Sequence, residues 1–342
     1  TMAADTLYLE TGSTDPAYNL AFEEVVLQNR REGNTLLLWQ NDHAVVIGQN
    51  QNAEEEINHA FVEAHGIRVV RRMTGGGAVY HDLGNLNYSW MTDVENAGAI
   101  TYQQFTRPVV EALRGLGMAA EASGRNDILV EGRKVSGTAQ RLLGKRILHH
   151  GTLLFDSDPE MIAGALRVDA SKFQSKSTKS VRSRVGNIRE FLRTDMTLPD
   201  FWEYLKGSLG GEALQSGSLT EAEHQQVLRL KAEKYDAWEW TFGRTPRFSF
   251  ANRHRWDGGL LEVRVQAENG RITAARFYGD FLSLCPPAPL EAALRGRLFQ
   301  RADVAQALRG LPLQNYLGGI REQEVLDTMF PVSGPKSEAP SF

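Results

Sequence analysis

The sequence has very little cysteine, with Cys285 as its single example in 342 residues. One thiol excludes an intramolecular disulfide and argues against a cysteine-based zinc site. Long apolar runs are also missing, since no stretch of about 18 apolar residues occurs, and the N-terminal residues lack the basic and apolar segments of a signal peptide. We therefore expect a cytoplasmic protein that does not interact with membranes.

A strong charge of either sign is absent as well. The formal net charge is -4 and the sequence pI is about 6.1, which gives no overall attraction to nucleic acid. Binding of anions must then be local, and residues 172–189 form one local concentration of basic and hydroxyl side chains. Because residues 171–187 have almost no apolar periodicity, we expect them to form a mobile loop that an anion orders into a lid.

The patterns of apolar residues predict an α+β protein with a large mixed sheet and a second, smaller α+β domain. Asp15 and Pro16 start a helix, as Asp158 and Pro159 do further on. Strands are expected at 35–39, 44–47, 67–71, 86–90 and 146–155, and helices at 53–66 and 102–116, the latter kinked or restarted at Pro108. We predict a catalytic domain over 1–206, a Ser/Gly-rich linker over 207–219, a small domain over 220–330 and a disordered tail over 331–342. The small domain should contain a hairpin at Asn269-Gly270, followed by three short helices.

Three successive glycines, Gly75, Gly76 and Gly77, follow two arginines at the end of a predicted strand. A glycine backbone can adopt positive φ, approach a ligand closely and turn its N–H groups toward an anion. Most glycine clusters are only turns, so this one needs support from other motifs.

A second motif is a predicted hairpin that joins Asp127–Val130 to residues 133–137 through Glu131-Gly132. Lys134 would lie beside a face of the sheet, where its ammonium group could neutralise charge as a carboxylate oxygen attacks a phosphorus atom. Asp127 could reach the same region only if the hairpin closes, and could then hold Mg²⁺ together with nucleotide phosphate. As alternatives, Lys134 could be an exposed turn residue and Asp127 a turn cap.

The histidines do not match a zinc-binding spacing, although His81 precedes an aspartate and His149 and His150 are adjacent. The sequence also lacks the Gly-x-Ser-x-Gly elbow of serine hydrolases. Hydrogen bonding inside a sheet or to phosphate is therefore the better interpretation.

Taken together, these motifs resemble the lipoate–protein ligase A family, which shares its fold type with biotin ligases and octanoyltransferases. The resemblance spans nearly the whole chain and rests on residues 71–85, 126–139, 149–154 and 180–188. It implies a reaction in which lipoate and ATP form lipoyl-AMP, whose acyl group is then transferred to a lysine of an acceptor protein. It also implies Mg²⁺ as a cofactor, with acceptors among the lipoyl domains of 2-oxoacid dehydrogenase complexes and the glycine-cleavage H protein.

The same resemblance implies the site residues. Lys134 would be catalytic, and lipoate and the adenylate would contact Trp39, Arg72, Gly75, Gly76, Gly77, Val79, His81, Asp127, Lys134, Ser136, Ala139, His150 and Gly151, with His149 as a further neighbour. The adenylate-binding loop would contribute Ser177, Lys179, Ser180, Arg182 and Arg184.

Three other functions remain open at this point. One is an octanoyl or lipoyl transferase, either cysteine-independent or dependent on Cys285. The thioester type would need Cys285 as its nucleophile, although a small buried hydrophobic residue is the simpler interpretation of this cysteine. A non-catalytic lipoate-binding protein would not need the nucleotide side of the site. A biotin ligase would have a different glycine-arginine loop.

Overall fold

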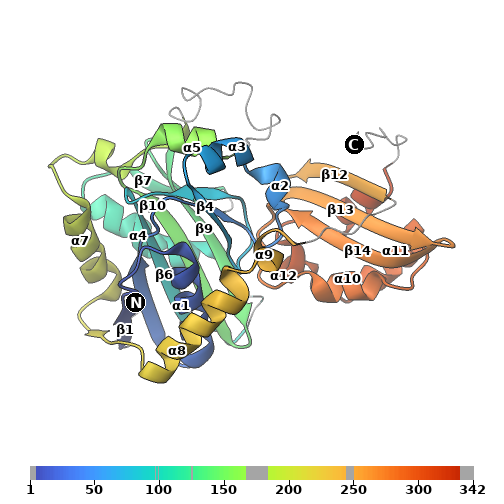
Figure 1. Ribbon diagram of the computed structural model, residues 1–342, viewed down its shortest axis with the longest axis horizontal. Helices are drawn as coiled ribbons and strands as arrows, with labels where there is room; N and C mark the ends of the chain where they lie inside the picture. Colours follow the sequence, from blue (N-terminus) through green and yellow to red (C-terminus); the bar gives the residue numbers. More distant parts are fainter. Residues whose placement is uncertain are drawn as a thin grey trace.

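A computed structural model describes residues 5–96, 98, 100–124, 126–166, 184–243 and 250–331 of the chain (Figure 1). A large body contains the N-terminal part of the sequence, and a smaller body with its own sheet lies beside it. The α+β class and the division into a large mixed sheet and a small α+β unit are confirmed.

The large body is built on a mixed sheet of eight strands among the described residues, in the order β11-β1-β2-β6-β10-β9-β8-β7. The strands are β1 (Thr6–Leu9), β2 (Asn34–Trp39), β6 (Asn85–Asp93), β7 (Ala120–Ser123), β8 (Asp127–Val130), β9 (Arg133–Leu143), β10 (Arg146–Leu154) and β11 (Leu214–Ser216). β1 pairs in parallel with β2 and β11, whereas the other pairs are antiparallel. The long central strands β6, β9 and β10 form the floor on which the site is built.

A second sheet of the large body has the order β4-β3-β5. It consists of β3 (Ala44–Ile47), β4 (Arg68–Arg71) and β5 (Val79–His81), with β3 parallel to β4 and antiparallel to β5. The glycine loop, which we define as residues 72–78, joins the two outer strands and must therefore cross the end of β3.

Helices of the large body cover both faces of the eight-stranded sheet and pack against the three-stranded sheet. They are α1 (Pro16–Asn29), α2 (Ala53–Glu56), α3 (His59–Ala64), α4 (Tyr102–Gly115), α5 (Pro159–Ala165), the 3₁₀ helix η2 (Ile188–Phe191), α7 (Leu198–Gly210), α8 (Glu221–Leu230), the π-helix η3 (Lys231–Tyr235) and α9 (Trp238–Thr241). One hydrophobic core includes residues of α4 and α7, and another surrounds α1. None of the described helices is long and apolar enough to cross a membrane.

Local sequence signals account for several helix boundaries. Asp15 accepts hydrogen bonds from the amides of Ala17 and Tyr18, with Pro16 at the first helical position, as predicted. The helix expected over 53–66 is instead two short helices, because Asn58 caps a new start by accepting a hydrogen bond from the amide of Phe61. The expected restart at Pro108 was wrong, since α4 continues through this residue as one helix.

The small body has an antiparallel sheet in the order β12-β13-β14, formed by β12 (Phe250–Trp256), β13 (Gly259–Glu268) and β14 (Arg271–Gly279). The predicted hairpin at Asn269-Gly270 is confirmed, because these residues have φ angles of 50° and 75° in the turn between β13 and β14. Four short helices follow instead of the expected three: α10 (Ala288–Leu294), α11 (Arg301–Leu308), α12 (Leu313–Leu317) and α13 (Glu322–Met329). Together with the sheet they enclose a separate core.

The boundary between the bodies differs from the one expected at 207–219. These residues complete α7 and supply β11, which pairs with β1 in the large sheet. The segment 220–243 also belongs to the large body, because Val227 of α8 and Tyr235 of η3 join the core around α1. The glycines that suggested a linker end a helix, with Gly211 at its C-terminal cap and a φ of 70°. Residues 244–249 and most of the predicted tail, 332–342, lie outside the described residues.

Candidate functional site

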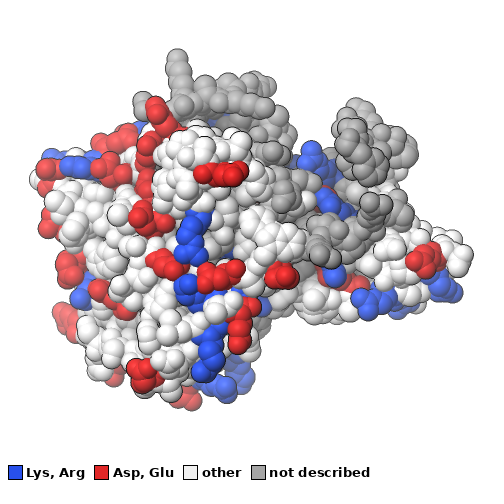
Figure 2. Space-filling model, in the orientation of Figure 1, with Lys and Arg blue, Asp and Glu red and all other residues white. Residues whose placement is uncertain are grey.

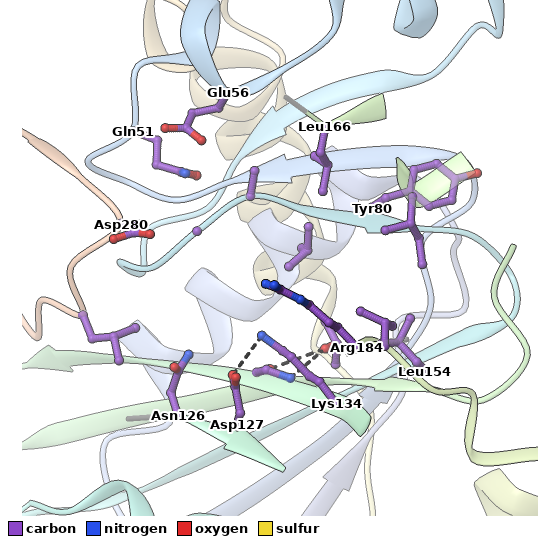
Figure 3. A pocket seen from close by; sticks show the side chains of 18 of the residues that line it. Gln51, Glu56, Tyr80, Asn126, Asp127, Lys134, Leu154, Leu166, Arg184 and Asp280 are labelled. Carbon is purple, nitrogen blue, oxygen red and sulfur yellow. Dashed lines mark hydrogen bonds and ion pairs between the residues drawn. The ribbon is translucent and has the colours of Figure 1, made fainter. Parts of the chain in front are cut away.

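Two adjoining cavities lie between the glycine loop and the central strands. The larger has a volume of about 620 Å³, and the smaller about 110 Å³. Residues common to both are Gly77, Ala78, Val79, Asn126, Lys134, Gly137 and Thr152. Figure 3 shows the larger cavity, with Lys134 and Asp127 on one side and Gln51 and Asp280 near the opposite rim.

The glycine loop folds around the side chain of Arg72. Its guanidinium donates hydrogen bonds to the carbonyl oxygens of Gly75 and Gly77, at 2.6 and 2.8 Å, and to that of Val46 at 3.2 Å. Burial lowers the pKa of Arg72 to about 10, which still leaves it charged at neutral pH. Arg72 also lines the smaller cavity, so it shapes the loop and faces the ligand space at the same time.

Close backbone packing explains part of the glycine pattern. Gly76 has a φ of 91°, and a Cβ atom on Gly48, at the end of β3, would lie 2.0 Å from the carbonyl oxygen of Gly76. Gly76 and Gly77 line the smaller cavity, whereas Gly75 lines neither. A Cβ atom on Gly75 would lie 2.8 Å from the backbone nitrogen of Ser283, so contact with the small body requires this glycine.

Lys134 and Asp127 form an ion pair, with 2.8 Å between Nζ and Oδ1, at the junction of the two cavities (Figure 3). The predicted hairpin is therefore closed, which is the condition under which Asp127 could reach the same region as Lys134. Its turn residues Glu131 and Gly132 have φ angles of 50° and 77°. Both charged side chains are partly exposed, at 38% and 34%, so a ligand can reach them.

A β-bulge sets the direction of Lys134. Leu129 pairs with Lys134 but Ile128 pairs with Ser136, which leaves Val135 as an extra residue in β9. Lys134 consequently shares a face with Gly137, where an added Cβ atom would lie 3.1 Å from the lysine Nζ. The missing side chain at Gly137 provides the space for the lysine.

The same bulge removes Ser136 from the site. In a regular strand, Ser136 would share a face with Lys134. In the structure Ser136 is fully buried and lines neither cavity.

The smaller cavity is lined by Trp39, Val46, Val79 and Ala139 together with polar side chains. Its predicted neighbours Trp39, Arg72, Gly76, Gly77, Val79, His81, Lys134, Ala139, His150 and Gly151 all line it. Strand alternation separates the two adjacent histidines, since His150 faces this cavity while His149 stacks on Phe105 in the core, with 5.0 Å between ring centroids. His149 therefore does not contribute to either cavity.

A chain of buried hydrogen bonds supports the smaller cavity. His150 Nε2 lies 2.7 Å from Thr74 Oγ1, and its Nδ1 lies 2.8 Å from Glu23 Oε1. Glu23 also accepts a hydrogen bond from Ser89, which in turn accepts one from the indole nitrogen of Trp39. The glycine loop is thus connected to the cavity wall through a carboxylate with no exposed surface.

Sequence analysis did not identify Glu23 or Ser89. The sequence contained a signal, because Glu23 and Glu24 interrupt the apolar residues between Leu20 and Leu27 in a helix that is buried on nearly all sides. A carboxylate at such a position needs a polar partner.

Buried polar atoms at the cavities lack partners among the described residues. They are Nε2 of His81, Oδ1 of Asn85 and Nδ2 of Asn87. Burial, with smaller effects of Arg72 and His150, lowers the pKa of His81 to about 3, so its imidazole is neutral at physiological pH. Nδ1 of His81 lies 3.0 Å from the side-chain nitrogen of Asn41. Such unsatisfied groups are consistent with a site that a polar ligand or water completes.

No cluster of three or more metal-binding side chains occurs in the part of the chain that the structure describes. Mg²⁺ needs no such cluster, because it commonly takes one or two carboxylates and completes its shell with phosphate oxygens and water. Asp127 is a carboxylate of this kind, with a partly exposed side chain in the larger cavity.

Of the predicted adenylate-binding residues, Ser177, Lys179, Ser180 and Arg182 lie outside the described residues. Arg184 is described and lines the larger cavity (Figure 3). The chain after it is fixed to the hairpin, since the amide of Gly186 donates to the carbonyl of Lys134 at 2.9 Å. This end of the segment is therefore held directly beside the lysine.

The small body closes one side of the larger cavity with Arg255, Leu260, Asp280 and Leu282. Backbone hydrogen bonds join the bodies, from the amide of Gly76 to the carbonyl of Phe281 at 3.1 Å and from Gly279 to Asn50 at 2.8 Å. On the face seen in Figure 2, acidic and basic side chains of the large body are interspersed. Cys285 lines neither cavity, and burial raises the pKa of its thiol.

Two family models match the sequence. Residues 15–210 match the lipoyl protein ligase A/B catalytic domain, and residues 245–329 match the bacterial lipoate protein ligase C-terminus. The chain is 40% identical over 323 residues to lipoate-protein ligase LplJ of Bacillus subtilis, covering 92% of this chain and 97% of the relative. It is 39% identical over 318 residues to lipoate–protein ligase 1 of Staphylococcus aureus, with the same coverage of both chains.

Solved structures show the same fold. P. falciparum LipL1 in complex with lipoate has a TM-score of 0.77 at 23% identity, covering 94% of this chain and 97% of that chain. A bipartite lipoate protein ligase from Thermoplasma acidophilum, studied with its E2 lipoyl domain, has a TM-score of 0.63 at 30% identity, with coverages of 73% and 100%. A lipoate-protein ligase A bound with ATP has a TM-score of 0.60 at 29% identity, with coverages of 70% and 98%.

Proposed function

The chain belongs to the lipoate–protein ligase family, and we propose that it activates lipoate with ATP and transfers the lipoyl group to a lysine of lipoyl-domain proteins. The observation that carries this proposal is the position of Lys134 where the two cavities meet. A carboxylate in the smaller cavity and a nucleotide in the larger one would come together at this ammonium group. The ATP-bound relative supports the assignment of the larger cavity to the nucleotide.

In the first step, a carboxylate oxygen of lipoate attacks the α-phosphorus of ATP. A new bond forms between this oxygen and the α-phosphorus. The bond between the α-phosphorus and the oxygen that bridges it to the β-phosphorus breaks, and its electron pair leaves with pyrophosphate. Lys134 lowers the barrier by placing positive charge between two anionic reactants, and no protein nucleophile is needed. Asp127 holds the lysine in position and would hold Mg²⁺, which supplies additional positive charge to the phosphate oxygens.

In the second step, the neutral amine of an acceptor lysine attacks the carbonyl carbon of the mixed anhydride. An amide bond forms, the bond between the acyl carbon and the AMP oxygen breaks with its electron pair leaving on AMP, and the proton of the amine passes to solvent. Lys134 can polarise the same carbonyl, because it lies at the reacting centre in both steps.

The smaller cavity is suited to the acyl chain. Its apolar lining by Trp39, Val46, Val79 and Ala139 matches an aliphatic chain, and the neutral His81 adds no charge. Because Gly76 and Gly77 have no side chains, the acyl chain of lipoate and the phosphate can approach the glycine loop closely. Residues of the segment Ser177, Lys179, Ser180, Arg182 and Arg184 would contact the adenylate.

Acceptors are proposed to be lipoyl domains of 2-oxoacid dehydrogenase complexes and the glycine-cleavage H protein, which places the enzyme in the cytoplasm. The Thermoplasma acidophilum ligase, studied with its E2 lipoyl domain, supports the class of acceptor. A thioester route through Cys285 has no support in the geometry, since this thiol lines neither cavity. A purely lipoate-binding role would leave the pairing of Lys134 with Asp127 in the larger cavity unexplained.

The proposal is tested by incubating the protein with lipoate, MgATP and an apo lipoyl domain, followed by intact mass spectrometry. We expect the mass of one lipoyl group to be added to the domain, and no addition when ATP is omitted. A lipoyl domain whose acceptor lysine is replaced by arginine serves as the control. No addition in the complete mixture, or equal addition without ATP, would contradict the proposal.

A further inference from the structure

A wall of the larger cavity comes from the small body, and it carries a fixed cation. The guanidinium of Arg255 on β12 lies 3.2 and 3.3 Å, through its two terminal nitrogens, from Oδ2 of Asp280. The second carboxylate oxygen of Asp280 accepts a hydrogen bond from the amide of Leu260 at 2.6 Å. Asp280 is only 7% exposed, so this arrangement fixes the orientation of Arg255 at the cavity.

Lys134 and Asp127 form a similar pair on the wall that belongs to the large body. Figure 3 shows Asp280 on a different side of the cavity from that pair. Each body thus brings a cation held by a carboxylate to the same space. A ligand that fills the cavity would be contacted by cations from both bodies.

The charges of the lining residues indicate which part of a ligand Arg255 contacts. The described residues of the larger cavity include three cationic side chains, Lys134, Arg184 and Arg255, and three carboxylates, Glu56, Asp127 and Asp280. Because these positive and negative formal charges cancel, the cavity as a whole does not attract an anion. An anionic ligand therefore depends on direct contacts with the individual cations. An adenine ring and a ribose carry no charge, whereas a polyphosphate matches the planar guanidinium, which can donate two parallel hydrogen bonds.

We propose that Arg255 is a catalytic residue of the adenylation step and contacts the β- and γ-phosphoryl groups of ATP. This inference rests on the proposed function. Lys134, at the mouth of the acyl cavity, serves the α-phosphate, so the groups that leave lie toward the wall of the small body. As the bond between the α-phosphorus and the bridging oxygen breaks, negative charge grows on pyrophosphate, and Arg255 stabilises it.

Pyrophosphate has left before the acceptor lysine attacks. Arg255 is therefore needed for the formation of lipoyl-AMP and for the reverse reaction with pyrophosphate. It is dispensable for transfer of the lipoyl group from lipoyl-AMP. A structural role of the pair with Asp280 would impair both steps together, which makes the two roles separable.

The experiment compares the full-length protein with Arg255→Ala, Arg255→Gln and Arg255→Lys. Arg253→Ala is the matched control, because Arg253 lies on the same strand and lines neither cavity. Three quantities are measured: lipoate-dependent exchange between pyrophosphate and ATP, transfer from supplied lipoyl-AMP to an apo lipoyl domain, and the affinity for lipoyl-AMP. Circular dichroism monitors folding of each variant.

We expect Arg255→Ala and Arg255→Gln to slow the exchange reaction about 10- to 100-fold, as for the loss of a charge-assisted hydrogen bond, and to raise the KM for pyrophosphate. Transfer and lipoyl-AMP affinity should change by less than about twofold. Arg255→Lys should be intermediate, because a lysine supplies charge without the two-pronged geometry. Arg253→Ala should behave like the unchanged protein.

Exchange within threefold of the unchanged protein in Arg255→Gln would overturn the proposal, and so would equal losses of exchange and transfer. If Arg255→Ala does not fold, Arg255→Gln and Arg255→Lys decide, because both keep a hydrogen-bond donor for Asp280. Failure of the unchanged protein itself to form lipoyl-AMP would instead contradict the proposed function on which this inference rests.

Discussion

The imidazole of His150 lies 2.8 Å from the carboxylate of Glu23, although 127 residues separate them in the sequence. Glu23 has no exposed surface, and the opposite ring nitrogen of His150 lies 2.7 Å from the hydroxyl of Thr74 in the glycine loop. The buried carboxylate thereby fixes both the histidine and the loop that lines the smaller cavity.

Replacement of Glu23 by alanine should destabilise the protein strongly. The change removes the buried partner of Nδ1 of His150 and of the Ser89 hydroxyl proton, and each buried polar group left unsatisfied typically costs about 1–3 kcal/mol. Urea unfolding measures the loss, with Glu10→Ala as a control because Glu10 is exposed. Equal midpoints for the two variants would show that the chain of hydrogen bonds contributes little.

Lys134→Ala should abolish formation of lipoyl-AMP without unfolding the protein. The lost cation faces developing charge and is worth roughly two to three decades in rate, by comparison with single oxyanion donors. Lipoate-dependent exchange between pyrophosphate and ATP provides the measurement, and Lys145→Ala, in the turn between β9 and β10, is the control. Exchange above a third of the normal rate would rule out the proposed role of Lys134.

Gly75→Ala should impair lipoyl-AMP formation more than transfer from supplied lipoyl-AMP. The added Cβ atom would lie 2.8 Å from the backbone nitrogen of Ser283 and 2.9 Å from the carbonyl oxygen of Phe281. The small body could then not pack against the glycine loop as it does in the structure. Gly207→Ala is the matched control, because it lies in α7 with nothing within 4 Å of the new Cβ atom and should be neutral or slightly stabilising. Equal effects of Gly75→Ala on both half-reactions would argue against this coupling.

Acid should destabilise the protein through its buried histidines. Burial lowers the pKa of both His81 and His149 to about 3, against a usual value near 6.5. Between these values the unfolded chain binds protons that the folded protein does not, so the free energy of unfolding falls as the pH falls. Each imidazole can contribute up to about 1.4 kcal/mol per pH unit.

His149→Gln tests this dependence on pH. The variant should show a smaller difference between its urea midpoints at pH 7 and pH 5 than the unchanged protein, whatever its stability at pH 7. His65→Gln, an exposed position, is the control. An undiminished difference in the His149 variant would mean that this ring does not cause the acid sensitivity.

Cys285→Ser should leave ligation with lipoate and MgATP essentially unchanged. Burial raises the pKa of the thiol, which disfavours the thiolate that a thioester route needs. The same protein without ATP should not transfer an acyl group from octanoyl-carrier protein. Loss of ligation in a folded serine variant, or clear acyl transfer without ATP, would favour the thioester route.

Local signals in the sequence predicted much of the fold. Asp15 with Pro16, the hairpin turn at Glu131-Gly132 and that at Asn269-Gly270 all act through a few neighbouring residues, and the structure confirms each. The boundary at 207–219 failed because glycine and serine composition is similar in a linker and at the end of a helix. Only the pairing of β11 with β1 shows which of the two is present.

The sequence by itself determined the motifs: the glycine loop, the lysine hairpin and the position of Asp127 near it. Tertiary structure alone decided which side chains share the site. The bulge at Val135 turns Lys134 toward Gly137 and Ser136 away from the cavity. Folding brings Glu23 of α1 to His150 of β10, and Arg255 of the small body to the larger cavity. Turn and capping preferences depend on neighbours in the chain, whereas strand register and the partners of buried charges depend on contacts across the fold.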